Sequence, residues 1–148
     1  MEARMKNPLF VVPGAMDFVQ PIAKLLHEAD VSIDLEYVSL RASQINGCSV
    51  CLDMHTKALR KNGEPEDKVH AVAAWRESVL FSDAERAALA LTEAATRLAD
   101  KSEPVPDEIW DEAADHFSEQ ELGMLVISIA AINFFNRINA TTKQLAGA

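Results

Sequence analysis

The two cysteines of this sequence, Cys48 and Cys51, are separated by two residues, and His55 follows four positions after the second. If a helix begins near Cys48, both sulfurs lie in its first turn, close enough to form a local disulfide. The unpaired N–H groups and positive dipole end of a helix N-terminus stabilise a thiolate, which is the nucleophilic form of cysteine. His55 then projects from the same helix face one turn later, where it can exchange protons with the thiols directly or through a water. The spacing predicts thiol–disulfide chemistry.

Glu36 is a further candidate because of where an antiparallel helix would place it. If a helix ending at Asn46-Gly47 turns back into the helix of the cysteines, Glu36 lies eleven residues before Gly47 and His55 lies eight after it. The difference of three residues corresponds to about 4.5 Å along the helix axis. A glutamate side chain and a water molecule can span that distance. The geometry therefore permits a proton relay from Glu36 through water to His55 and the cysteines.

Proline, glycine and capping residues divide the rest of the chain into helical segments. The expected helices cover residues 16–29, 33–45, 48–60, a short segment after Pro65, 82–98, 106–116 and 118–138. Two of them begin with capping boxes, Ser82 with Glu85 and Ser118 with Glu121. No run alternates as a strand does. The sequence predicts an all-α fold of about six or seven helices, forming a single domain over residues 1–148 with the cysteine pair at the N-terminus of a central helix.

Charge and hydropathy narrow the classes of partner. The chain carries 14 Lys plus Arg against 23 Asp plus Glu, a net charge of −9, which argues against a nucleic-acid-binding surface and against docking on anionic membranes. No uninterrupted apolar run reaches the length of about 18 residues expected of a membrane span. No glycine-rich phosphate-binding motif is present, so no bound cofactor is expected.

These features make a cytoplasmic location the default expectation. Cysteines in a reducing compartment are rarely structural staples, so the pair needs another explanation. The last predicted helix is apolar around most of its circumference from Leu122 to Phe135, and a helix of that kind must be buried on several sides. In so small a domain, an interface between copies of the chain is a natural way to bury it, so a homo-oligomer is expected.

The set Glu36, Cys48, Cys51 and His55, with spacings of twelve, three and four, resembles the core motif of the AhpD-like alkylhydroperoxidase / carboxymuconolactone decarboxylase family. Residues 40–47, 54–55, 61–63 and 133–139 also look like that family, and the resemblance covers roughly residues 17–142. It implies an AhpD-like helical domain, oligomers such as trimers or hexamers, and reduction of a hydroperoxide substrate by a thiol or dithiol electron donor. No bound metal is expected.

The resemblance also implies a role for each residue. Cys51 would be the attacking thiolate that becomes a sulfenic acid, and Cys48 would donate a proton and then close the disulfide. Glu36 and His55 would move protons. The sequence departs from the family at one position, because peroxidases of the family have a second histidine where this chain has Val50.

Several alternatives stay open at the level of sequence. In helix-start CxxC motifs the earlier, more exposed cysteine usually has the lower pKa, which favours Cys48 as the nucleophile. The same four residues, Cys48, Cys51, His55 and Glu36, have side chains of the kinds that bind zinc, although no second cysteine pair exists. Lactone decarboxylation, the other activity of the family, does not need the cysteine pair. A non-enzymatic redox sensor whose disulfide changes the oligomeric state is the remaining hypothesis.

The other histidines, His27, His70 and His116, have no partner pattern and are expected at the surface. Trp75 and Trp110 are expected to be core or interface anchors rather than ligand contacts.

Overall fold

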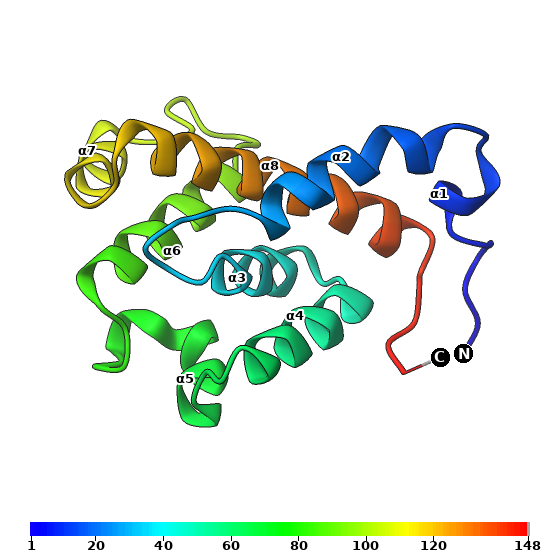
Figure 1. Cartoon of the computed structure of the whole chain (residues 1–148), viewed down its shortest axis with the longest axis horizontal. Helices are drawn as coiled ribbons and strands as arrows, with labels where there is room; N and C mark the ends of the chain where they lie inside the picture. Colours follow the sequence, from blue (N-terminus) through cyan, green and yellow to red (C-terminus); the bar gives the residue numbers. More distant parts are fainter. Residues whose placement is uncertain (148) are drawn as a thin grey trace.

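The structure is a computed structural model that describes residues 1–147, and all the regular secondary structure in these residues is helical (Figure 1). The elements in chain order are α1 (Pro8–Val11), α2 (Ala15–His27), α3 (Glu36–Asn46), α4 (Ser49–Lys61), α5 (Glu66–Ala71), the 3₁₀ helix η1 (Val72–Glu77), α6 (Asp83–Thr96), α7 (Asp107–His116) and α8 (Glu119–Thr141). The all-α prediction is confirmed, and so is the position of the cysteine pair at the start of α4.

Local signals in the sequence set most helix ends. The Ser82 hydroxyl accepts the Glu85 N–H at 3.2 Å while the Glu85 carboxylate accepts the Ser82 N–H, and Ser118 and Glu121 repeat the arrangement at the start of α8. Gly47 ends α3 in the left-handed region, with φ of 67°. A side chain in that region would be strained, so glycine lets the chain reverse directly from α3 into α4.

Two features differ from the expectation. Helix α3 begins at Glu36 rather than at residue 33, because the Asp34 carboxylate accepts the Glu36 N–H at 2.9 Å and satisfies the helix start there. The short helices α1 and η1 have too few residues to show a periodic pattern. Trp75 is a core residue as expected, and Trp110, which is 42% exposed in this chain, stays a predicted interface anchor.

Helix α3 occupies the centre of the molecule, with α4, α6 and α8 around it (Figure 1). Its side chains enter three separate apolar clusters. Tyr37 and Leu40 pack with α4, α5, η1 and α6, Val38 packs with α6, α7 and α8, and Ala42 packs with both cysteines. Because its positions contribute to every cluster, α3 is the element that fixes the others relative to the cysteines.

Glu93 of α6 anchors α3 through a buried carboxylate. Its carboxylate accepts hydrogen bonds from Arg41 of α3 at 2.7 Å, from the Trp75 indole at 3.0 Å and from Arg76. Burial raises the pKa of Glu93, but these hydrogen bonds outweigh burial and leave the pKa below its usual value. The residue is therefore a buried anion that links three elements.

Helix α8 is the longest element, and it crosses the molecule beside α3. Its 23 residues have a mean hydropathy of 1.4 in the most apolar window, so by length and composition it would suffice to cross a membrane, although its apolar residues do not form one uninterrupted run. In this structure it packs against α2, α3, α4, α6 and α7. Val126, Ile127 and Phe134 remain about 40% exposed on it, and the homo-oligomer that would bury them stays a prediction.

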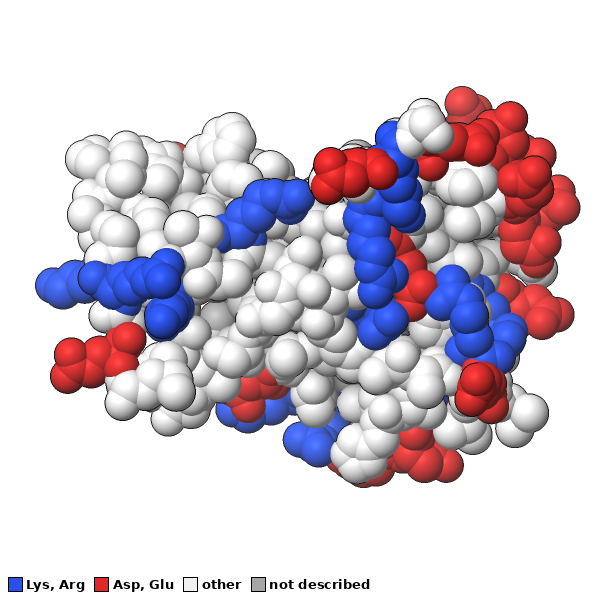
Figure 2. Space-filling model, turned by 180° about the vertical axis from the view of Figure 1, so that it is seen from behind, with Lys and Arg blue, Asp and Glu red and all other residues white. Residues whose placement is uncertain are grey.

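The acidic excess is unevenly distributed. Figure 2 shows acidic side chains gathered along the right-hand edge of the molecule, the end at which α7 lies. Five of the ten residues of α7 are Asp or Glu, against no Lys or Arg. His27, His70 and His116 are exposed, as expected.

Candidate redox site

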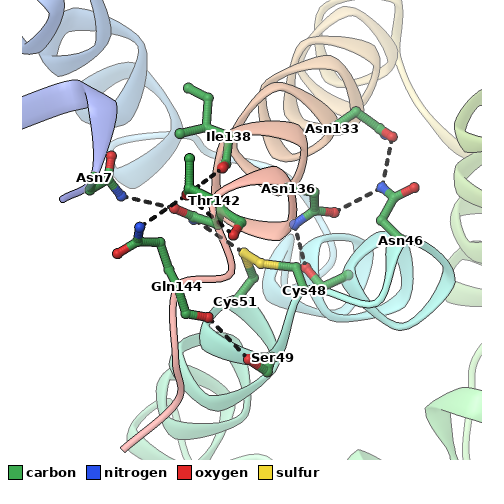
Figure 3. The surroundings of a disulfide bond; sticks show 12 residues. Asn7, Asn46, Cys48, Ser49, Cys51, Asn133, Asn136, Ile138, Thr142 and Gln144 are labelled. Atoms are coloured by element: carbon green, nitrogen blue, oxygen red, sulfur yellow. Dashed lines mark hydrogen bonds between the residues drawn. A yellow bond between two sulfur atoms is a disulfide. The ribbon is translucent and has the colours of Figure 1, made fainter. Parts of the chain in front are cut away.

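Cys48 and Cys51 form a disulfide across the first turn of α4, with their Cα atoms 5.3 Å apart. Cys48 is the N-cap residue and Cys51 lies in the first turn, so the bridge closes directly after the reversal at Gly47. The two cysteines are only 1% and 2% exposed. The pair is therefore a local disulfide held inside the fold, between α4 and the C-terminal half of α8 (Figure 3).

Glu36 and His55 meet one helical turn beyond the disulfide. The distance from His55 Nδ1 to Glu36 Oε2 is 2.6 Å, so the two side chains bond directly and need no intervening water. The His55 side chain is 17% exposed and the Glu36 side chain 33%, which leaves the pair open to solvent or a small ligand. When Glu36 accepts the Nδ1 proton, Nε2 is the ring atom free to take up or release another proton.

Asp34 holds this pair in place from the helix ends. One of its carboxylate oxygens accepts the Glu36 N–H at 2.9 Å, and the other accepts the Asn62 side-chain amide at 2.8 Å. Asp34 thus ties the start of α3, which carries Glu36, to the end of α4, which carries His55. Among the described residues no hydrogen bond joins His55 to either sulfur. The last step of the predicted relay, between the imidazole and the cysteines, therefore stays a prediction.

Asparagines from α3 and α8 form a second polar group beside the disulfide (Figure 3). The Asn46 amide donates to Asn133 at 3.0 Å and to Asn136 at 2.9 Å, and Asn136 in turn donates to the Ser43 hydroxyl at 3.0 Å. Asn136 is completely buried. These bonds lock the end of α3 onto α8, which fixes the turn from which the cysteines project.

Asn139, one turn further along α8, contacts the disulfide itself. Its Nδ2 donates to Cys51 Sγ at 3.5 Å, and its Oδ1 accepts from Asn7 Nδ2 at 2.9 Å. In the sequence, residues 133–139 stand out only for their resemblance to a family, and the contact with Cys51 was not predicted. The signal that could have revealed it is the spacing of Asn133, Asn136 and Asn139, which places an amide at each third position of the helix.

The two ends of the chain meet over this region. The Arg4 N–H donates to the Thr142 carbonyl at 2.9 Å, and the Gln144 side chain donates to the Met5 carbonyl at 3.0 Å. The Ser49 hydroxyl of α4 donates to the Gln144 carbonyl at 3.3 Å. The N-terminal segment and the C-terminal tail therefore lie together near the start of α4.

A metal centre was the alternative use of the same residues. Within residues 1–147, no three side chains of His, Cys, Asp or Glu lie together in a way that could hold a metal ion. In this structure both cysteine sulfurs are occupied by the disulfide.

Comparison with known proteins places this chain in a family. The model of the carboxymuconolactone decarboxylase family matches residues 33–94, which include Glu36, both cysteines and His55. YdfG of Bacillus subtilis, an uncharacterised protein, is 35% identical over 130 residues, which are 87% of this chain and 87% of that protein. The chain belongs to the carboxymuconolactone decarboxylase family.

Two further matches carry the name AhpD. Alkyl hydroperoxide reductase AhpD of Solibacter usitatus is 42% identical over 65 residues, which are 44% of this chain and 35% of that protein. A crystal structure of a protein of unknown function from Agrobacterium tumefaciens, named as a candidate antioxidant defence protein AhpD, matches with a TM-score of 0.89. Its sequence is 30% identical, and the match covers 99% of each chain. The fold is therefore AhpD-like, as the resemblance implied.

Proposed function

We propose that the protein reduces hydroperoxides with the Cys48–Cys51 pair and is returned to its reduced form by a thiol or dithiol donor. The observation that carries the proposal is the disulfide-linked cysteine pair at the start of α4, with a directly bonded Glu36–His55 pair one turn away. The similarity to AhpD over 65 residues supports the same chemistry.

The reaction begins from the dithiol. The Cys51 thiolate attacks one oxygen of the hydroperoxide, the O–O bond breaks, and the departing alkoxide takes a proton to leave as an alcohol. Cys51 is then a sulfenic acid. The Cys48 sulfur attacks the Cys51 sulfur, and the hydroxyl leaves as water. One hydroperoxide and two thiols become one alcohol, one water and the disulfide, which is the state that the structure holds.

The Glu36–His55 pair supplies and removes protons in this scheme. His55 lies one turn after Cys51 on α4, and the Glu36 carboxylate accepts its Nδ1 proton, so that Nε2 is the atom that exchanges protons. The position held by a second histidine in peroxidases of the family is Val50, which packs against the cysteine cluster as an apolar side chain. His55 therefore carries the proton transfers without a second imidazole beside Cys51.

Steady-state consumption of an organic hydroperoxide in the presence of dithiothreitol tests the proposal. Wild type should turn over, and Cys51→Ser should lose turnover because the nucleophile is gone. In a separate assay without dithiothreitol, Cys48→Ser should react once and stop, because no second thiol remains to release water from the sulfenic acid. Full activity of Cys51→Ser would refute the proposal. Turnover of a carboxymuconolactone by the Cys48→Ser, Cys51→Ser double variant would instead assign the decarboxylase reaction of the family.

A further inference from the structure

The hydrogen bonds around Asn139 determine which end of its amide faces the disulfide. The Leu9 backbone N–H, which can only donate, binds Asn7 Oδ1 at 3.0 Å. The Asn7 amide therefore points its Nδ2 at Asn139, 2.9 Å from Oδ1. Asn139 Oδ1 is thus the acceptor, and its Nδ2 is the group 3.5 Å from Cys51 Sγ. Although the oxygen and nitrogen of an amide could exchange places by a half-turn, a backbone donor at the end of this chain of bonds selects one orientation.

We propose that Asn139 is a catalytic residue that stabilises the Cys51 thiolate by donating a hydrogen bond to its sulfur, and that Asn7 is a positioning residue that keeps the Asn139 amide in the donating orientation. The inference rests on the proposed function for the reaction in which the thiolate takes part.

Burial is the reason that Cys51 needs such a donor. The residue is 2% exposed and packs with Ala42 and Ile132, and an apolar environment disfavours the charged form of a thiol. The N-terminal N–H groups of α4 offset part of that cost. A directed side-chain donor adds a hydrogen bond that strengthens when sulfur becomes negatively charged.

The same contact distinguishes the two cysteines. Both are buried to a similar degree, so exposure does not favour Cys48 as it would in an open helix-start motif. Among the described residues, the Cys51 sulfur accepts a side-chain hydrogen bond and the Cys48 sulfur accepts none. The donor therefore favours Cys51 as the thiolate that attacks the hydroperoxide.

Asn139 acts in the reductive half-reaction as well. When the donor thiolate attacks Cys48 Sγ, the disulfide bond breaks, and Cys51 leaves as the thiolate that accepts the Asn139 hydrogen bond. A second donor thiol then attacks the mixed disulfide and releases Cys48. The two donor thiols become a disulfide, and the cysteine pair becomes the dithiol. A better leaving group departs faster, so the same amide favours both halves of the cycle.

The test measures the ionisation of Cys51 without requiring turnover. In the reduced Cys48→Ser protein, the rate of alkylation by iodoacetamide against pH gives the pKa of the Cys51 thiol. Adding Asn139→Leu, which has nearly the same size but no donor, should raise that pKa by about one unit, a tenfold loss of thiolate at a pH below both values. Asn139→Asp should raise it further, because a carboxylate then faces the sulfur. An unchanged pKa in the leucine variant would overturn the proposal.

Asn7→Ser tests the positioning role and serves as the second variant if substitutions at Asn139 prevent folding. Serine still caps the Leu9 N–H but cannot reach Asn139, so the amide is free to turn. The Cys51 pKa should rise, and the rise should vanish when Asn139→Leu is already present. No rise in Asn7→Ser, or an equal rise in both backgrounds, would remove Asn7 from the proposal.

Gln144→Ala is the matched control. It removes the hydrogen bonds from the C-terminal tail to Met5 and Thr142 but leaves the Asn7–Asn139–Cys51 chain intact. The Cys51 pKa should stay as in the parent, whereas a rise equal to that of Asn139→Leu would show general loosening and overturn the proposal. If the pKa shifts as expected but wild type consumes no hydroperoxide, only the proposed function fails. If wild type turns over and the pKa does not move, only the role of Asn139 fails.

Discussion

Replacing Glu93 by glutamine tests the anchor that holds α3, and with it Glu36, against α6. Glu93 is 7% exposed, and glutamine would leave the Arg41 guanidinium, 13% exposed at its side chain, without its counter-charge. Removing one partner of a buried ion pair costs about 3–5 kcal/mol. We expect the lower end, about 3 kcal/mol, because the other cations, Arg76 and Arg97, are 56% and 47% exposed and can return to water. For a chain of this size that corresponds to a fall in Tm of about 6–12 °C.

Urea unfolding and thermal melts followed by circular dichroism at pH 7 measure this loss. Glu66→Gln is the matched control, because Glu66 pairs with Arg60 at an exposed site and its loss should leave Tm almost unchanged. Hydrogen bonds hold the pKa of Glu93 below its usual value of 4.5 although burial raises it, so its contribution is present above pH 4.5 and is lost as the pH falls. The difference between wild type and variant should therefore narrow in acid. A loss below about 1 kcal/mol at pH 7 would refute the view of Glu93 as a buried anchor.

Three further predictions follow from single contacts. Glu36→Gln should lower kcat/KM for hydroperoxide by about 10²-fold or more while leaving the urea midpoint near that of wild type, and unchanged kcat/KM would exclude Glu36 from proton transfer. Hydrogen bonds from Ser118 and Ser32 lower the pKa of Glu121 to about 2. The stability lost in Glu121→Gln should therefore be constant above pH 4.5 and disappear as the pH falls towards 2. Urea unfolding across that range checks the trend, and a stability difference between wild type and variant that widens in acid would contradict it. Gly47→Ala should destabilise by about 1–2 kcal/mol in urea because φ is 67° there, and a neutral effect would mean that the α3–α4 turn relaxes freely.

Most of the fold was predictable because its signals are local. The capping boxes at Ser82 and Ser118 and the glycine stop at Gly47 each depend on residues within four positions of one another, and each forms as expected. Helix α3 begins later than predicted because the Asp34 carboxylate accepts the Glu36 N–H inside the segment that was predicted to be helical. Helix ends therefore followed from the sequence wherever a single favoured cap was present.

The site was predictable only in part because some of its contacts join distant segments. Cys48, Cys51 and His55 lie on one helix, and their proximity follows from helical spacing alone. The direct bond between Glu36 and His55 depends on how closely α3 packs on α4, and counting residues allowed a water in its place. The contact from Asn139 to Cys51 spans 88 positions and requires α8 to dock on α4. The regular spacing of the asparagines could single out Asn139 as a candidate, but it could not name Cys51 as its partner.

Intact-mass analysis of the reduced protein after one equivalent of hydroperoxide, with dimedone present, tests the central claim most directly. Wild type should lose the mass of two hydrogens within seconds as the disulfide forms. The Cys48→Ser variant should gain a dimedone adduct on Cys51, because its sulfenic acid has no partner thiol. A sulfenate trapped only on Cys48, in the Cys51→Ser variant, would keep the reaction and reverse the roles of the cysteines. Thiols that stay reduced for hours would contradict the proposed reaction.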